Sequence, residues 1–240
     1  AGLDNIPLEK AKECGIAVCN VPGTNSNAVA DLAIGLMLAV TRNIVIANNR
    51  VRNGEWKPAI GVDVCFKTLG IFGFGAIAKN VARRANGFGM KVLAYDPYVK
   101  EVPEEFKSFV TLCSIDEIIK NADIISMHLP LTDETRDMIS AKEMAAMKEG
   151  AYIINTARGG IVNEHDLYEA VKSGHIAGAA LDVSEQEPMA EDNPLRTLEN
   201  VIITPHIGMY SKEAIGAVSL ICAQNAAAKI EGKELQFQVV

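Results

Sequence analysis

The chain has 240 residues, 49% hydrophobic and 22% charged, and its 23 basic and 30 acidic side chains give a formal net charge of −7. This composition is typical of a folded globular protein and excludes a disordered or collagen-like chain. The acidic balance argues against nucleic-acid binding, because neutralising phosphates requires clustered Lys and Arg. It disfavours an anionic membrane surface for the same reason.

The five cysteines are scattered and form no C-x-x-C pair, which predicts neither a disulfide framework nor a zinc site. We therefore expect a reducing, cytoplasmic environment and no bound metal. The most apolar stretch, 28–40, contains Asp31 and is too short to span a bilayer. The sequence starts at Ala1 without an initiator Met or a signal segment, which indicates a piece of a longer chain.

Short apolar runs bounded by turn residues alternate with helix-period segments. The expected strands are 16–19, 69–72, 92–94, 124–127, 152–154, 177–181 and 201–203. The expected helices between them are 76–86, 115–121, 141–147 and 164–173. Strand and helix alternation at this spacing predicts right-handed crossovers and a doubly wound parallel α/β sheet.

Two longer helical patterns bracket most of these strands. Residues 25–52 are predicted to form one helix with an apolar stripe, and residues 211–231 a second. We expect both to connect two domains, with the strand 16–19 in the other domain. The apolar surface of 25–52 exceeds what one domain covers, which predicts a homodimer. Trp56 is expected to pack at a domain junction.

A glycine-rich turn follows the strand 69–72. Gly73 permits a tight turn, Gly75 allows close backbone approach, and Ala78 lets the next helix pack on the strand. A pyrophosphate would bind at the N-terminus of that helix. Asp96 follows 18 residues after Ala78, where a carboxylate binds ribose hydroxyls and repels a 2′-phosphate. Glycines also occur in turns without a ligand, but Asp96 favours a nucleotide site, with NAD as the cofactor.

Polar side chains follow three later strands, at the edge where open α/β sheets bind ligands. Arg158 could bind a substrate carboxylate through two parallel hydrogen bonds. His206 could exchange a proton with the carbinol oxygen during hydride transfer, and Glu187 would orient its imidazole. Each residue alone could be structural. Together, beside a nucleotide turn, they predict an oxidoreductase acting on a 2-hydroxy acid and its 2-keto acid.

The same segments resemble the D-isomer-specific 2-hydroxyacid dehydrogenase family over essentially the whole chain. The similar segments are 69–78, 128–132, 155–162, 182–188 and 205–208. The spacings of 29 residues from Arg158 to Glu187 and 19 from Glu187 to His206 agree as well. Within the family, 20–26 and 158–162 resemble the 3-phosphoglycerate dehydrogenase branch most closely.

This resemblance implies an NAD-dependent interconversion of a D-2-hydroxy acid and its 2-keto acid, with catalytic Arg158, Glu187 and His206. It implies a Rossmann NAD-binding domain at 23–207, including the long connecting helix. Fragments of a second, flavodoxin-like α/β substrate domain would occupy 1–22, with 208–240 returning to it as a helix.

The resemblance also assigns ligand contacts. The expected cofactor-binding residues are Gly73, Gly75, Ala76, Ile77, Asp96, Thr156, Ala157, Asp182, His206 and Gly208. The substrate carboxylate would be bound by Arg158 and by the backbone of 1–5, chiefly Gly2 and Leu3. Ser184 departs from the aromatic residue usual in the family, and Ala78 departs from the usual Gly.

Transcriptional corepressors that sense NAD(H) use the same fold and can keep these residues. A scaffold that binds NAD(H) and contacts partner proteins is therefore the alternative to an enzyme. Because most of a substrate domain is lacking, we expect these 240 residues to bind NAD but to show weak or no turnover alone.

Overall fold

The computed structural model describes residues 2–3 and 5–240. The chain divides into two compact units, called here unit 1 (residues 1–29 and 208–240) and unit 2 (residues 30–207). The first boundary falls inside helix α2 (Ser26–Thr41), which therefore continues from one unit into the next.

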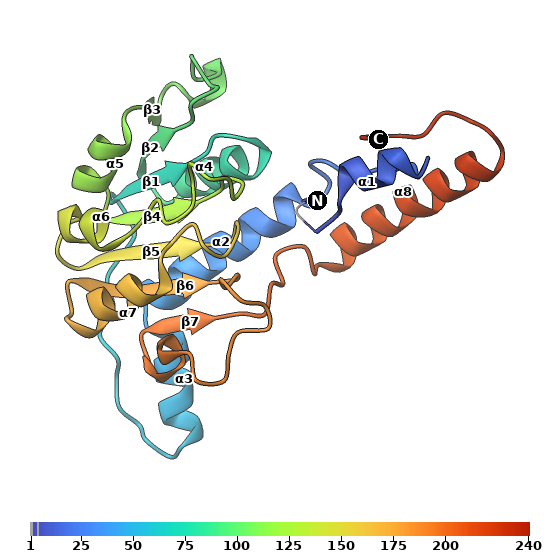
Figure 1. Ribbon diagram of the computed structural model, residues 1–240. Helices are drawn as coiled ribbons and strands as arrows, with labels where there is room; N and C mark the ends of the chain where they lie inside the picture. Colours follow the sequence, from blue (N-terminus) through green and yellow to red (C-terminus); the bar gives the residue numbers. More distant parts are fainter. Residues whose placement is uncertain (1, 4) are drawn as a thin grey trace. The chain divides into compact units, whose positions relative to one another are not determined.

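In the described residues of unit 2, seven strands form one parallel sheet in the order β3-β2-β1-β4-β5-β6-β7 (Figure 1). The strands are β1 (Thr68–Phe72), β2 (Lys91–Tyr95), β3 (Val110–Leu112), β4 (Ile124–Met127), β5 (Ala151–Asn155), β6 (Ile176–Leu181) and β7 (Val201–Ile203). The strand order reverses between β1 and β4, and open α/β sheets bind ligands at the carboxyl ends of the strands on either side of such a reversal. The predicted doubly wound sheet is confirmed.

Helices cover both faces of this sheet. The helices of unit 2 after α2 are α3 (Ile44–Arg52), α4 (Ala76–Gly87), α5 (Ile115–Asn121), α6 (Ala141–Ala146) and α7 (Glu164–Lys172), with single turns η1 (Glu104–Phe106) and η2 (Pro194–Thr197). Successive strand residues face opposite sides, so Ile71 packs in a core layer with α2 and α4, and Phe72 in a layer with α5, α6 and α7. The sheet is thereby buried on both faces, as its apolar strands predict.

One predicted strand is absent, and one observed strand was not predicted. Residues 16–19 form no strand, because Cys19 makes only an isolated antiparallel bridge to Gln238. The edge strand β3 was not predicted, because its three residues, Val110 to Leu112, are too short to show a pattern. The described part of unit 2 therefore has seven strands, one more than the six that the sequence predicts after residues 16–19.

The predicted single helix at 25–52 is two helices, α2 and α3, bent by 65° at their junction. Asn43 lies at this break with φ 51°, and its Nδ2 donates a hydrogen bond to the Ile60 carbonyl at 2.6 Å. A left-handed residue ends a helix, which the apolar periodicity does not reveal. Ile44, the first residue of α3, is 52% exposed.

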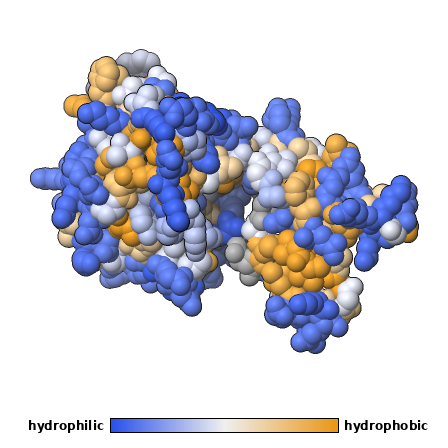
Figure 2. Space-filling model, turned by 90° about the horizontal axis from the view of Figure 1, so that it is seen from above, coloured by the Kyte–Doolittle hydropathy of each residue, from blue (hydrophilic) through white to orange (hydrophobic). Residues whose placement is uncertain are grey.

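Unit 1 contains the helices α1 (Leu8–Glu13) and α8 (Lys212–Ile230), the second close to its predicted bounds. The Asn225 side chain exchanges two hydrogen bonds with the Gln236 backbone and so fastens the last residues to α8. Figure 2 shows apolar surface on the part formed by α1 and α8, where Ile215, Leu220 and Ile230 are exposed.

Among the described residues, no single helix is both long and apolar enough to cross a membrane. The bent pair α2 and α3 reaches that length and composition only when the two helices are taken together. The apolar side of α2 lies in the core of unit 2, where Ala33, Met37 and Val40 are buried.

Candidate active site

The glycine turn lies at the carboxyl end of β1, as predicted. Gly73 has φ +89°, and a Cβ there would lie 2.7 Å from the His128 carbonyl oxygen. Both the left-handed backbone and the contact with this neighbouring segment therefore require glycine. The Gly73 N–H donates to the Tyr95 carbonyl at 2.7 Å, which ties the turn to the end of β2.

Gly75 is a glycine for a different reason. It is the N-cap of α4 with φ −77°, which any residue adopts, and a Cβ there would meet no heavy atom within 4 Å. Gly75 and Ala76 are exposed, so the first N–H groups of α4 face open space. Neither the backbone nor the protein around Gly75 requires glycine, and this turn fits a phosphate group that approaches the backbone closely.

Asp96 is held against the same turn. Its Oδ2 accepts a hydrogen bond from the Phe74 N–H at 2.8 Å, and its Oδ1 accepts one from the Tyr98 N–H at 2.9 Å. These bonds place a carboxylate beside the glycine turn, at the end of β2. A carboxylate there suits ribose hydroxyls and opposes a 2′-phosphate, which fits NAD.

Two buried polar atoms lie at the same edge of the sheet, just after the paired strands β4 and β5. His128 Nδ1 and Thr156 Oγ1 have no hydrogen-bond partner among the described residues. His128 Nε2 lies 2.9 Å from Ser126 Oγ, and burial lowers the pKa of His128 to about 4, so its imidazole is neutral at pH 7. Buried polar atoms are rarely left unsatisfied, and their presence here fits a polar ligand at this edge.

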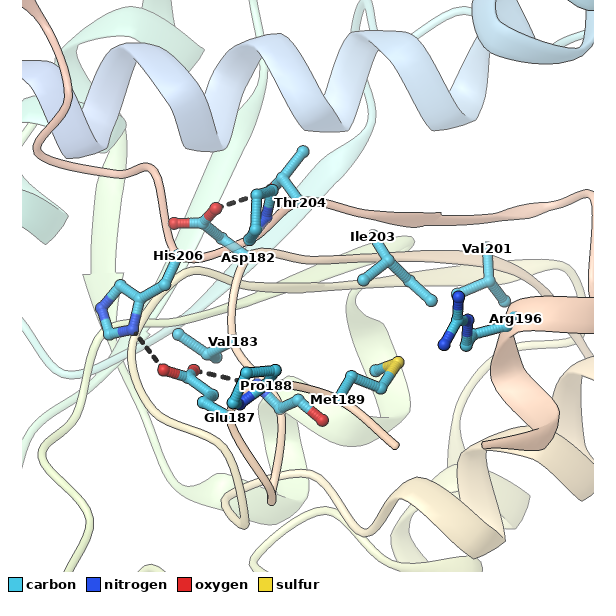
Figure 3. Close-up of a pocket in the computed structure, with 12 residues that line it drawn as sticks. Asp182, Val183, Glu187, Pro188, Met189, Arg196, Val201, Ile203, Thr204 and His206 are labelled. Carbon is cyan, nitrogen blue, oxygen red and sulfur yellow. Dashed lines mark hydrogen bonds and ion pairs between the residues drawn. The ribbon is translucent and has the colours of Figure 1, made fainter. Parts of the chain in front are cut away.

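Glu187 and His206, predicted as a pair, are in direct contact (Figure 3). His206 Nδ1 lies 2.8 Å from Glu187 Oε2, and Glu187 Oε1 accepts a hydrogen bond from the Ser184 N–H at 3.2 Å. His206 has φ 53°, a strained backbone for a residue other than glycine. Such strain persists where the surrounding structure holds the side chain in a required orientation.

Asp182 lies beside this pair at the end of β6 and is only 1% exposed. Its Oδ1 accepts hydrogen bonds from Thr204 Oγ1 at 2.6 Å and from the Ile207 N–H at 2.8 Å. Asp182 therefore joins the end of β6 to the segment that follows β7. This segment carries His206, so the buried carboxylate helps to set the position of the imidazole.

A cavity of about 780 Å³ opens next to these residues. Figure 3 shows His206, Glu187 and Asp182 at one end and Met189, Arg196 and Val201 at the other. The polar groups able to move a proton thus share a pocket with mainly apolar walls. Such a combination is typical of small-molecule sites.

Arg158 lies in the neighbouring loop after β5 and is half-buried. Its Nη1 donates to the Ala157 carbonyl at 2.7 Å. The next residue, Gly159, packs so closely that a Cβ would lie 1.9 Å from the Ser184 carbonyl oxygen. The loop carrying Arg158 therefore lies against the segment carrying Glu187.

Asn155 shapes the Arg158 loop and was not predicted. It is 2% exposed; its Oδ1 accepts from the Ala157 N–H at 3.0 Å, and its Nδ2 donates to the Arg158 carbonyl at 2.9 Å. A polar residue directly at the end of an apolar strand was the available signal. Thr204, which holds Asp182, follows β7 in the same way.

Comparison with known proteins agrees with this geometry. Residues 34–208 match the family model described as D-isomer specific 2-hydroxyacid dehydrogenase, NAD binding domain. The chain belongs to this dehydrogenase family. Residues 34–208 are its NAD-binding domain, and the glycine turn, Asp96 and the unsatisfied polar atoms are features that fit this cofactor.

Individual members of the family are similar over most or all of the chain. D-3-phosphoglycerate dehydrogenase of Methanocaldococcus jannaschii is 46% identical over 100% of this chain, which spans 46% of that protein. Hydroxypyruvate reductase of Thermotoga maritima is 47% identical over a region that covers 89% of this chain and 70% of that reductase. The crystal structure of D-lactate dehydrogenase with NAD+ from Lactobacillus jensenii gives a TM-score of 0.86 at 31% identity, covering 100% of this chain and 76% of that one. The chain thus spans about half the length of the Methanocaldococcus jannaschii protein.

The remaining predicted residues of this dehydrogenase domain divide between the two units. Ala76, Ile77, Thr156 and Ala157 lie in unit 2, on the two turns described above. Gly2, Leu3 and Gly208 belong to unit 1, and their ligand contacts stay predictions. Ala1 and Asp4, also predicted to bind the substrate carboxylate, lie outside the described residues. In the part of the chain that is described, no group of three His, Cys, Asp or Glu side chains is placed to hold a metal.

Proposed function

We propose that this chain is the catalytic part of an NAD-dependent oxidoreductase that interconverts a D-2-hydroxy acid and its 2-keto acid. The observation that carries the proposal is the 2.8 Å contact between His206 Nδ1 and Glu187 Oε2. A carboxylate acceptor keeps the proton of the neutral imidazole on Nδ1, which leaves the lone pair on Nε2. Among the described residues none forms a hydrogen bond with Nε2, so it is available to a substrate.

In the oxidising direction His206 Nε2 takes the proton of the substrate hydroxyl while the carbinol carbon gives up a hydride. Bound NAD supplies the hydride acceptor. Glu187 stabilises the imidazolium that forms, and Arg158 binds the substrate carboxylate next to the reacting carbon. In the reducing direction the same residues act in reverse, with His206 donating the proton to the carbonyl oxygen.

The substrate is proposed to be a small 2-hydroxy acid of the 3-phosphoglycerate or glyceric acid kind. Two relatives with nearly the same sequence identity to this chain are named for D-3-phosphoglycerate and for hydroxypyruvate. Both compounds have three carbons; the first is a 2-hydroxy acid and the second a 2-keto acid. Unit 1 is proposed to contribute to the substrate domain.

The whole natural protein should oxidise NADH in the presence of one member of a panel of 2-keto acids, followed by absorbance. Turnover with no member, together with tight NADH binding, would contradict the enzyme and favour the NAD(H)-sensing scaffold. Arg158→Ala should raise the KM for the 2-keto acid at least tenfold, about 1.4 kcal/mol. NADH affinity should stay within about twofold, and an equal loss of NADH binding would show that the role of Arg158 is misassigned.

We also propose a homodimer formed through α2, α3 and the segment 53–66 that follows. The large apolar side chains that this region leaves at least half exposed are Ile44, Val51, Trp56, Ile60 and Phe66. Trp56, predicted to pack at a domain junction, is 89% exposed, which corrects that prediction.

The five cysteines are free thiols, and this supports the expected cytoplasmic location.

A further inference from the structure

The segment 183–193, which carries Glu187, has no helix or strand. Glu164, the first residue of α7, anchors it at two points. Its Oε1 accepts hydrogen bonds from Ser184 Oγ at 2.8 Å and from the Glu185 N–H at 2.7 Å. Its Oε2 accepts one from Asn193 Nδ2 at 2.7 Å. A single carboxylate therefore binds both ends of the segment, through hydrogen bonds of the strong, charge-assisted kind.

Ser184 connects this anchor to the acid-base pair. Its hydroxyl donates to Glu164, and its backbone N–H donates to Glu187 Oε1 at 3.2 Å. The other oxygen of Glu187, Oε2, lies 2.8 Å from His206 Nδ1. A continuous series of hydrogen bonds thus leads from Glu164 through Ser184 and Glu187 to the imidazole.

The third polar group of Ser184, its carbonyl, is restrained on another side. The backbone of Gly159 packs against it, and any side chain at Gly159 would overlap it. The hydroxyl, N–H and carbonyl of Ser184 each face a different neighbour. Ser184 has little freedom to move, so it can transmit the position of Glu164 to Glu187.

We propose that Glu164 and Ser184 are positioning residues for the acid-base pair. They hold Glu187 where it keeps the His206 proton on Nδ1 and leaves Nε2 for the substrate hydroxyl. This inference rests on the proposed dehydrogenase function and deepens it, because both residues act through Glu187. A purely structural role for Glu164 would instead be that of an acidic residue in the first turn of α7, favoured by the helix dipole.

The kinetic test uses Glu164→Ala and Ser184→Ala in the whole natural protein. Each substitution should lower kcat about tenfold, because a small displacement of Glu187 misplaces the imidazole, and should leave NADH affinity unchanged. In a Glu187→Ala background the same substitutions should cause no further loss of kcat. A further loss of full size in that background would overturn the proposal, since Glu164 and Ser184 would then not act through Glu187.

A second measurement does not depend on turnover. Nitrogen-15 NMR of the four histidines reports which ring nitrogen of His206 carries the proton. The wild type should show the Nδ1–H form, and Glu164→Ala and Ser184→Ala should shift His206 toward the Nε2–H form. An unchanged His206 spectrum in both variants would overturn the proposal. A protein that turns over no 2-keto acid but shows the expected shifts would contradict the proposed function and support the positioning role.

Glu143→Ala is the matched control for both measurements. Glu143 Oε2 accepts hydrogen bonds from Ser140 Oγ at 2.6 Å and from the Ser140 N–H at 3.3 Å, in the capping box of α6. Like Glu164, Glu143 is a carboxylate that accepts hydrogen bonds from a serine, but it lies on α6 and not on α7. In the described part of the chain, no hydrogen bond connects it to Glu187. Its replacement should leave kcat and the His206 spectrum unchanged, and effects equal to those of Glu164→Ala would show that the role is not specific.

Discussion

Gly73 and Gly75 lie two residues apart in one turn, yet different physical requirements select them. Gly73 is required by the protein itself, through its positive φ and the adjacent His128 carbonyl. Gly75 has an ordinary φ and open space around the position of a Cβ. The sequence motif treats both residues alike, and only the structure shows that the fold itself requires glycine at Gly73 and not at Gly75.

This difference gives a matched pair of variants. Gly73→Ala should reduce the free energy of unfolding by about 2–4 kcal/mol, through backbone strain and the clash at His128. Gly75→Ala should change it by less than about 1 kcal/mol but weaken NADH binding at least about tenfold. Urea denaturation and NADH titration of each variant measure both quantities. Unchanged NADH affinity in Gly75→Ala would contradict the phosphate role of this turn.

His128 makes stability depend on pH. Burial lowers its pKa in the folded protein to about 4, below the ordinary value of 6.5. Between these two values the unfolded chain binds more protons, so stability falls as the pH drops from about 6.5 toward 4. His128→Gln should remove about 2–3 kcal/mol of the stability difference between pH 7 and pH 4.5, measured by urea denaturation. The same pH dependence in the variant and the wild type would show that His128 is not the group responsible.

At the scale of elements, the junction between α2 and α3 differs most from the predicted single helix. The break depends on one residue, Asn43, which combines a left-handed backbone with a side-chain bond to the Ile60 carbonyl. That bond joins residues 17 positions apart, and no local pattern reveals it. The 65° bend directs α3 away from the path of α2, and α3 has no buried residue.

Asn43→Ala should therefore destabilise the protein by about 1–2 kcal/mol, because alanine disfavours the left-handed backbone and lacks the amide donor. Asn43→Gly should cost about half as much, since glycine restores the backbone freedom and loses only the hydrogen bond. Thermal unfolding compares the two variants with Asn49→Ala on α3, expected within about 0.5 kcal/mol of the wild type. Equal losses for the alanine and glycine variants would show that the left-handed conformation is not the cause.

At the scale of the whole molecule, the question is which surface a second copy could cover. In unit 2 the main apolar surface left exposed lies on α3 and the segment 53–66. Light scattering at micromolar concentration should give the mass of a dimer. Ile60→Asp should give a monomer, because Ile60 is 92% exposed in one chain and a charge there opposes burial against a second copy. Ile230→Asp, at an 87% exposed position on α8, is the control and should leave the dimer intact. A monomeric wild type would contradict the proposed dimer.

The sequence by itself determined the parallel sheet, the glycine turn and the positions of Arg158, Glu187 and His206. These features follow from local patterns, namely apolar runs between turns, glycine where φ is positive, and polar residues just after strands. The contact between Glu187 and His206 was also predictable, because both residues follow neighbouring strands at one edge of the sheet.

Only the tertiary structure decided how these residues are held. Ser184 bonds to Glu164 across 20 positions, Asp182 to Thr204 across 22, and Asn43 to Ile60 across 17. Such partners are chosen by the packing of elements that are distant in the chain, and polar residues in loops show no periodicity from which a partner can be inferred. Local chemistry therefore names the candidate residues of the site, and the folded chain alone selects the residues that bond to them.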